Sequence, residues 1–231
     1  MSVWAVIPAK IPWRAKTRLT PVLGPDERAA LARELLRRTV TAAAACPALE
    51  GVIVVSAAPD LRLLARELGA HAYADPDSRS GDHDALNAAV ALGARRAAAC
   101  GAAAVLILPA DLPLLTPSVI TRFLDEASDA AVALAPDRAG DGTNALLLRP
   151  PLALPPAFGP ASYARHQALA RGRGLTIMTV RLGALERDLD TPADLADLRN
   201  TLADLADLRN TLADLADLRN TLADLAEAPH G

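Results

Sequence analysis

The chain has 231 residues, with 24 basic and 27 acidic side chains, a net charge of −3 and a hydrophobic fraction of 52%. This length and hydrophobic content suffice for one large α/β domain, or two small ones, with a substantial core. The balanced charge argues against a nucleic-acid-binding protein, which would usually carry a basic excess.

Cysteine usage and hydropathy give a first indication of the compartment. Cys46 and Cys100 fall in alanine-rich stretches that favour helix, and we interpret both as buried free thiols in a reducing environment. Residues 3–7 are typical of a first strand rather than of a signal peptide. No segment is long and uncharged enough to span a bilayer, so we expect a cytoplasmic protein without a membrane partner.

Predicted strands and helices alternate along the chain. The strands are expected at residues 3–7, 52–55, 71–74, 105–108, 130–135, 145–148 and 175–180. The helices are expected at residues 28–45, 59–68 and 84–99, from residue 116, from the segment 158–166, and after Thr191. This alternation predicts an α/β fold, a three-layer sandwich around a mostly parallel sheet.

A basic loop follows the first predicted strand. It carries Lys10, Arg14, Lys16 and Arg18 within nine residues. Such a cluster at the carboxyl end of a buried strand suits a polyphosphate, because arginine offers forked hydrogen bonds and lysine a point charge. The alternative is a solvated basic loop.

Asp111 is an isolated acid just beyond the apolar strand at residues 105–108. Ligands of open α/β sheets gather at the carboxyl ends of the strands, and a carboxylate there is costly to bury without a metal, a proton or a cation. A helix-capping or turn acid is the alternative. Asp188 and Asp190 alternate in a segment that would point both the same way if extended, and we interpret them as the second acid source for a divalent cation.

Three further polar positions follow turns or open helices. Asn87 lies near a helix start, where an amide can read a base or ribose or simply cap the helix. Thr143 ends a glycine-rich turn at residues 136–144, which could approach a ligand or form a plain hairpin. Ser162, with Arg165 and His166 nearby, opens a helix that could form an anion pocket.

The C-terminal segment repeats ten residues, with repeats that begin at Thr201, Thr211 and Thr221. Its leucines recur about every 3.3 residues, which is shorter than the period of a straight helix or a coiled coil. Three interpretations are open. A single helix would wrap its apolar stripe steeply around a partner. Alternatively, the helix could break at Asn200 and Asn210, or the repeats could be a tandem duplication. We favour duplication with self-association as a side effect, and divide the chain into a domain at 1–199 and a repetitive helical tail at 200–231.

Taken together, the segments Ala9-Lys10, 15–19, 109–113, 140–144, 158–162 and 188–192 resemble the phosphoenolpyruvate or 2-phospho-L-lactate guanylyltransferases of coenzyme F(420) biosynthesis. The resemblance extends in order from residue 3 to about residue 198. It implies a Rossmann-like nucleotidyltransferase fold and an enzyme that transfers GMP from GTP to phosphoenolpyruvate, giving enolpyruvoyl-diphospho-guanosine and pyrophosphate. The same reaction on 2-phospho-L-lactate is the alternative.

The resemblance also implies roles for individual residues and partners. GTP and a phosphorylated three-carbon acid are the expected small-molecule partners, and a homodimer is considered. The implied Mg²⁺ ligands are Asp111, Asp188 and Asp190; the acceptor-binding residues are Thr143, Gly159 and Ser162. Lys16 and Arg18 would face the triphosphate and act in catalysis with Asp111, and we add Lys10 and Asn87 as nucleotide-binding residues.

Two other function classes remain at this point. One is a different nucleotidyltransferase, of the sugar or molybdopterin type. The other is a non-catalytic scaffold organised by the leucine-rich repeats.

Overall fold

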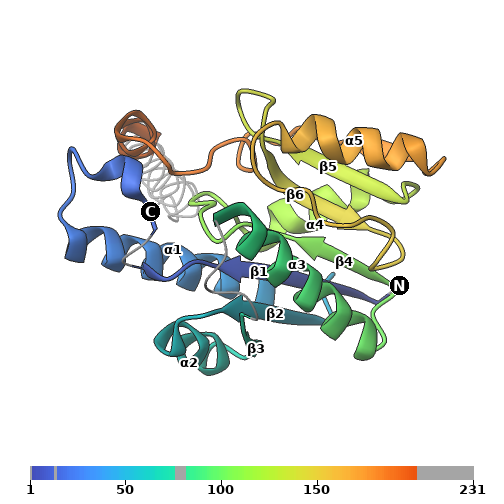
Figure 1. Cartoon of the computed structure of the whole chain (residues 1–231), viewed down its shortest axis with the longest axis horizontal. Helices are drawn as coiled ribbons and strands as arrows, with labels where there is room; N and C mark the ends of the chain where they lie inside the picture. The colour runs from blue at the N-terminus through green and yellow to red at the C-terminus, as the bar shows by residue number, and fades with distance from the viewer. Residues whose placement is uncertain (1, 13–14, 76–81, 202–231) are drawn as a thin grey trace, which may run out of the picture. The chain divides into compact units, whose positions relative to one another are not determined.

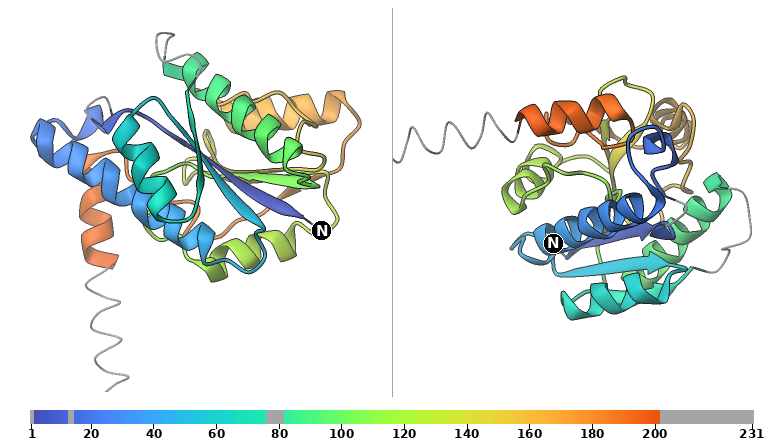
Figure 2. Two further views of the ribbon diagram at one scale, coloured as in Figure 1. Left: turned by 90° about the horizontal axis from the view of Figure 1, so that it is seen from below. Right: turned by 90° about the vertical axis from the view of Figure 1, so that its left-hand side faces the viewer.

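The computed structural model of the chain describes residues 2–12, 15–75 and 82–201. The chain separates into two compact units, Met1–Thr191 and Pro192–Gly231. The first unit holds a seven-stranded sheet with helices on both faces, as Figures 1 and 2 show. In the part of the chain that is described, no helix combines the length and apolar character needed to cross a membrane.

The sheet has the strand order β3-β2-β1-β4-β6-β5-β7. Neighbouring strands run parallel except that β6 is antiparallel to both β4 and β5. The prediction of a mostly parallel sheet is therefore confirmed. The strands are β1 (Val3–Ala9), β2 (Gly51–Ser56), β3 (His71–Ala74), β4 (Ala104–Ile107), β5 (Val132–Pro136), β6 (Thr143–Leu148) and β7 (Ile177–Thr179).

The helices are α1 (Pro25–Ala44), α2 (Pro59–Glu67), α3 (Asp82–Ala99), α4 (Pro117–Glu126) and α5 (Ser162–Gly172), with a short 3₁₀ helix η2 (Thr17–Leu19). Buried residues of α1, α2 and α4 share one core layer, and those of α3 and α5 share the other. In the left view of Figure 2, α3 and α5 lie above the sheet and α4 lies below it. This is the predicted three-layer arrangement.

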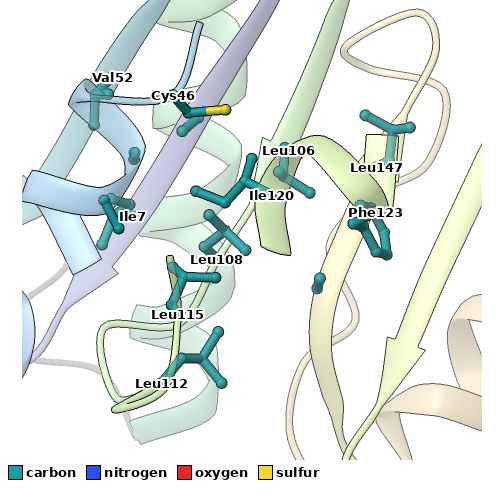
Figure 3. Packing of buried hydrophobic residues seen from close by; sticks show 14 of the residues in the cluster. Ile7, Cys46, Val52, Leu106, Leu108, Leu112, Leu115, Ile120, Phe123 and Leu147 are labelled. Atoms are coloured by element: carbon teal, nitrogen blue, oxygen red, sulfur yellow. The ribbon is translucent and has the colours of Figure 1, made fainter. Parts of the chain in front are cut away.

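Side-chain alternation along the strands builds both layers. In β1, Ile7 belongs to the layer under α1 and α4, whereas Val6 belongs to the layer under α3. All seven residues of β1 are buried, as expected for a central strand of a parallel sheet. Figure 3 shows Ile120 and Phe123 of α4 packed among Leu106 and Leu147 of the sheet.

The end of β1 and the beginning of α5 differ from the predictions, and a proline or a glycine lies near each. Strand β1 continues through Pro8 to Ala9, because β4 pairs with β1 only as far as Val6 and so Pro8 needs to donate no ladder hydrogen bond on that side. Helix α5 begins at Ser162 rather than near Phe158, since Gly159 (φ +117°) and Ala161 (φ +53°) have left-handed backbones that no α-helix accepts.

The prediction for the cysteines is half right. Cys46 is buried as expected, but Cys100 is exposed. Cys100 lies after the last residue of α3, in the turn that Gly101 makes with a positive φ of 87°, and this turn carries it out of the core. The alanine-rich composition of α3 provides no sharp apolar stripe from which the sequence could have shown this.

The second unit is described as far as residue 201, and residues 192–201 form a helix. This helix runs through the predicted domain boundary at 199/200. Most of the predicted tail, residues 202–231, lies outside the described residues, so the tail assignment remains a prediction.

Candidate active site

One edge of the sheet collects the predicted site residues. Strands β1 and β4 end there, and the antiparallel strand β6 begins there. Asp111 follows β4, and the backbone N–H of Leu189 donates a hydrogen bond to the carbonyl of Asp111 at 3.2 Å. Because Leu189 is fully buried between them, Asp188 and Asp190 are held against the end of β4.

Lys16 joins the two acid segments. Its Nζ donates to Asp111 Oδ2 at 2.7 Å and to Asp190 Oδ1 at 2.8 Å, while its side chain is only 7% exposed. The backbone of Lys16 is left-handed, with φ 56° and ψ 34°, a conformation that costs a lysine about 1 kcal/mol. The following η2 turn, anchored by the fully buried Leu19, holds the lysine in this position. The predicted convergence of Asp111 and Asp190 is thus observed.

The charges of this group shift its protonation equilibria. Burial alone would lower the pKa of Lys16, but the negative charges of Asp111 and Asp190 outweigh it and raise the pKa overall. Burial would raise the pKa of Asp190, but the positive charges of Lys16 and Arg18 outweigh it and lower the pKa. At neutral pH the arrangement is therefore a cation held between two carboxylates.

Asp188 is the acid that this cation does not contact directly. Burial, followed by the negative charges of Asp111 and Asp190, raises its pKa to about 6. The amide nitrogen of Asn144 lies 3.5 Å from Asp188 Oδ1 and donates more closely, at 2.9 Å, to the carbonyl of Leu185. Asp188 is therefore more readily protonated than an exposed aspartate.

A cavity of about 410 Å³ opens beside this group. Among its lining residues are Lys10, Lys16 and Arg18 from the basic loop, together with Asp111 and Asp190. Arg18 is 75% exposed, and its Nη1 lies 3.9 Å from Asp190 Oδ2. The structure thus brings three of the four predicted cations to the acids, while Arg14 lies outside the described residues.

Asn87 lies beside the cavity but faces the backbone of Phe158. Its Oδ1 accepts from Phe158 N at 2.8 Å, and its Nδ2 donates to Phe158 O at 3.2 Å. Phe158 itself lines the cavity, as does Leu86. The amide thus fixes an aromatic wall of the cavity, a role that sequence reasoning missed because residues 87 and 158 are distant in the chain.

The predicted acceptor-binding residues also come together. Ser162 Oγ donates to Thr143 Oγ1 at 3.2 Å, and Gly159 lies in the turn that leads into Ser162. Asp141 Oδ2 accepts from the backbone N–H of Ala161 at 3.2 Å and so stabilises the left-handed backbone of Ala161, which lies between Gly159 and Ser162. These residues do not line the 410 Å³ cavity but adjoin its wall at Phe158.

His166 completes this second cluster in a way that the sequence did not indicate. It is fully buried, and its ring stands edge-on to Phe158 with centroids 4.9 Å apart. Burial, followed by the positive charge of Arg165, lowers its pKa to about 4. The residue is therefore neutral near pH 7 and does not supply the positive charge that an anion pocket would use.

The acids at this edge of the sheet are also candidate ligands for a divalent metal. In residues 2–12, 15–75 and 82–201, no three His, Cys, Asp or Glu side chains form a ready metal-binding group. The ammonium group of Lys16 supplies the positive charge between Asp111 and Asp190. Asp111 and Asp190 nevertheless offer hard oxygen donors of the kind that Mg²⁺ prefers, and Asp188 is near enough for their negative charges to raise its pKa in addition to burial.

Sequence comparison matches residues 3–201 to the protein family described as guanylyl transferase CofC like. A phosphoenolpyruvate guanylyltransferase of Sphaerobacter thermophilus is 42% identical over 198 residues, which cover 86% of this chain and 93% of the relative. Another, of Rubrobacter xylanophilus, is 44% identical over 204 residues, with 86% and 94% covered.

Solved structures of nucleotidyltransferases share the fold. A nucleotidyl transferase from Methanothermobacter superposes with a TM-score of 0.62 at 16% identity, covering 88% of this chain and 99% of that one. A 4-diphosphocytidyl-2C-methyl-D-erythritol synthase from Anaerococcus prevotii does so with a TM-score of 0.58 at 10% identity, covering 87% and 96%. At these identities the likeness concerns the fold alone.

Proposed function

The chain belongs to the guanylyl transferase CofC like family, and from this premise we propose that it transfers GMP from GTP to phosphoenolpyruvate. The reaction would give enolpyruvoyl-diphospho-guanosine and pyrophosphate, as a step of coenzyme F(420) biosynthesis. Family membership makes the chain a nucleotidyltransferase and removes the non-catalytic scaffold from consideration.

The observation that carries the proposal is the Asp111–Lys16–Asp190 group at the edge of the sheet, next to a cavity with further cations. Both substrates are anions, so the barrier to their reaction is mainly electrostatic and positional. Lys16, Lys10 and Arg18 offer positive charge where the triphosphate of GTP would lie. In this role they would bind the triphosphate and offset charge that develops on the departing pyrophosphate.

The bond changes need no general base. A phosphate oxygen of the acceptor attacks the α-phosphorus of GTP, a new phosphorus–oxygen bond forms, and the bond from the α-phosphorus to the bridging oxygen breaks. The second pKa of a phosphate monoester is about 6, so the attacking oxygen is already deprotonated near pH 7. This agrees with the neutral, buried state of His166.

Mg²⁺ is part of the proposal, with Asp111, Asp188 and Asp190 as its protein ligands. When bound, the ion would neutralise phosphate charge and orient the triphosphate. The proposal is supported by the carboxylates of Asp111 and Asp190, which meet at one ammonium group, and by Asp188, whose pKa is raised by burial and then by the negative charges of these two acids. Asn144 would hold Asp188 in place from β6.

The acceptor assignment follows the relatives, which are named phosphoenolpyruvate guanylyltransferases at 42 and 44% identity. We assign Thr143, Gly159 and Ser162 to its phosphate and carboxylate, and the choice of phosphoenolpyruvate over 2-phospho-L-lactate rests on these names. Asn87 would contribute to GTP binding indirectly, because it fixes Phe158 in the wall of the cavity. A cytoplasmic location and a homodimer are further parts of the proposal.

A single experiment tests the proposed reaction. The full chain is incubated with GTP, Mg²⁺ and either phosphoenolpyruvate or 2-phospho-L-lactate, and pyrophosphate release is measured. We expect release with GTP and phosphoenolpyruvate, and weaker release when CTP or ATP replaces GTP. Preference for CTP or ATP would instead support a sugar- or molybdopterin-type nucleotidyltransferase, and preference for 2-phospho-L-lactate would overturn the acceptor assignment.

A further inference from the structure

Three buried polar side chains form a closed cluster next to the candidate active site. Thr143 is 5% exposed, Ser162 is 2% exposed and His166 is fully buried. Thr143 Oγ1 lies 3.1 Å from His166 Nδ1 and accepts from Ser162 Oγ at 3.2 Å. Buried polar groups of this kind are costly unless their hydrogen bonds are satisfied, so the direction of each proton in the cluster is constrained.

The backbone determines which nitrogen of His166 carries the proton. The N–H of Ala157 lies 3.1 Å from His166 Nε2 and can only donate, so Nε2 must be an unprotonated acceptor. In the neutral ring the proton is therefore on Nδ1, which faces Thr143. In a doubly protonated ring, the N–H at Nε2 would face the N–H of Ala157, and the two donors could not form a hydrogen bond.

This tautomer fixes the role of the Thr143 hydroxyl. Its oxygen accepts one hydrogen bond from His166 Nδ1 and another from Ser162 Oγ, which occupies both of its lone pairs. Among the described residues, Thr143 Oγ1 makes no further hydrogen bond. Thr143 can then engage a ligand only as a donor, as a phosphate or carboxylate oxygen requires.

The ring of His166 is also held in its plane. Phe158 packs against it edge to face, at 71° between the ring planes, and Asn87 in turn holds the backbone of Phe158 on both sides. The histidine is thus fixed by Ala157 at one nitrogen and by the ring of Phe158, which packs against it at a steep angle. A side chain that is constrained so fully is suited to orienting a neighbour.

We propose that His166 is a positioning residue of the acceptor site, which turns the hydroxyl proton of Thr143 toward an anionic oxygen of the acceptor. The inference deepens the proposed function and rests on it, because the ligand is taken to be the phosphorylated acid. His166 does not touch the substrate and takes no part in proton transfer. Without it, Thr143 could donate to Ser162 instead, and the hydroxyl would face the acceptor only part of the time.

The first test is spectroscopic and uses the wild-type full-length chain. Long-range ¹H–¹⁵N NMR distinguishes the two neutral tautomers of a histidine from each other and from the imidazolium form. We expect His166 to carry its proton on Nδ1 throughout pH 6–8, in agreement with its lowered pKa. A ring that is protonated on Nε2, or on both nitrogens, would overturn the proposal without reference to any mutant.

The second test is a double-mutant cycle on His166→Gln and Thr143→Val, in which pyrophosphate release is measured. Glutamine can still accept from Ala157 N but offers no donor at the position of Nδ1, so we expect His166→Gln to raise the KM for phosphoenolpyruvate about tenfold, which corresponds to about 1.4 kcal/mol. The KM for GTP should change by less than about twofold. In the Thr143→Val background the histidine substitution should have almost no further effect, because the hydroxyl that it orients is already absent.

Controls separate positioning from general damage. His71→Gln removes an exposed histidine from β3 and should leave both KM values unchanged. Thr143→Ser keeps a hydroxyl and should retain most of the sensitivity to His166→Gln. Additive effects in the cycle, or an equal rise of both KM values, would contradict the proposal. If the wild type itself shows no pyrophosphate release with phosphoenolpyruvate, the proposed function fails, whereas the NMR experiment still decides the tautomer on which His166 acts.

Discussion

The ion-pair group centred on Lys16 makes a quantitative prediction for Lys16→Met. Methionine keeps an unbranched side chain at the same left-handed backbone position, so the change isolates the loss of the ammonium group. Breaking a buried ion pair costs about 3–5 kcal/mol, but Asp111 and Asp190 are 26% and 40% exposed, and water screens part of the effect. We expect a loss of about 2 kcal/mol in the free energy of unfolding, close to that of one hydrogen bond to a charged group.

The pH dependence of this loss follows from the pKa directions. The pKa of Lys16 is raised in the folded protein, so its stabilisation is fully present below its unfolded pKa of about 10.4 and is lost as pH rises through the folded value. The pKa of Asp190 is lowered, so its stabilisation is present above about pH 3.9 and is lost as pH falls through the folded value. The difference between wild type and Lys16→Met should therefore be largest between about pH 5 and pH 9.

Urea denaturation of both proteins across this pH range provides the assay. Arg33→Met, which breaks the exposed pair of Arg33 with Asp60 at 3.2 Å, is the matched control and should cost less than about 1 kcal/mol. A Lys16→Met loss that is no larger than that of the control, or one that does not vary with pH, would refute the reasoning.

Three further predictions follow from the site and the tail. Asp111→Asn should lower turnover by about a hundredfold to a thousandfold while circular dichroism shows an intact fold; normal turnover would refute the assignment of Asp111 as a Mg²⁺ ligand. Asp188→Asn should reduce turnover but stabilise the protein at pH 8 by about 2 kcal/mol. The stabilisation arises because the folded pKa of about 6 lies above the unfolded value, so ionisation of Asp188 costs folding free energy as pH rises from about 4 to 6. The gain in stability should vanish at pH 4, and urea denaturation at both pH values measures it. A chain that ends at Asn200 should keep the wild-type rate of pyrophosphate release, and a loss of activity would show that the repeats are needed.

Much of the fold could be predicted because its signals are local. Apolar runs such as residues 105–108 predict buried strands, and Thr116 with Pro117 marks the beginning of α4, where Thr116 Oγ1 accepts from Val119 N. Glycines with positive φ, such as Gly69, end helices where the sequence places them. The predicted ends of the elements were less accurate near Pro8 and near Ala161, because strand pairing and a hydrogen bond to Asp141 determine the backbone conformation there.

The sequence singled out residues that the structure brings together, but it did not show which contacts each of them makes. Asn87 was expected to face a nucleotide, yet its amide binds the backbone of Phe158, 71 residues away. His166 follows Arg165 in what looks like an anion pocket, yet burial keeps it neutral. In both cases the deciding contacts come from segments that no local pattern connects.

The sequence by itself determined that carboxylates and cations follow strand ends, because strand runs, turn residues and helix caps act over a few neighbouring positions. Only the tertiary structure decided how these charges pair. Lys16 is 95 and 174 residues from the two acids that it bridges, and the antiparallel direction of β6 brings Asn144 to the same edge as Asp188. Coulomb interactions and desolvation depend on separation and burial in space, so the charge state of the site is a property of the folded chain.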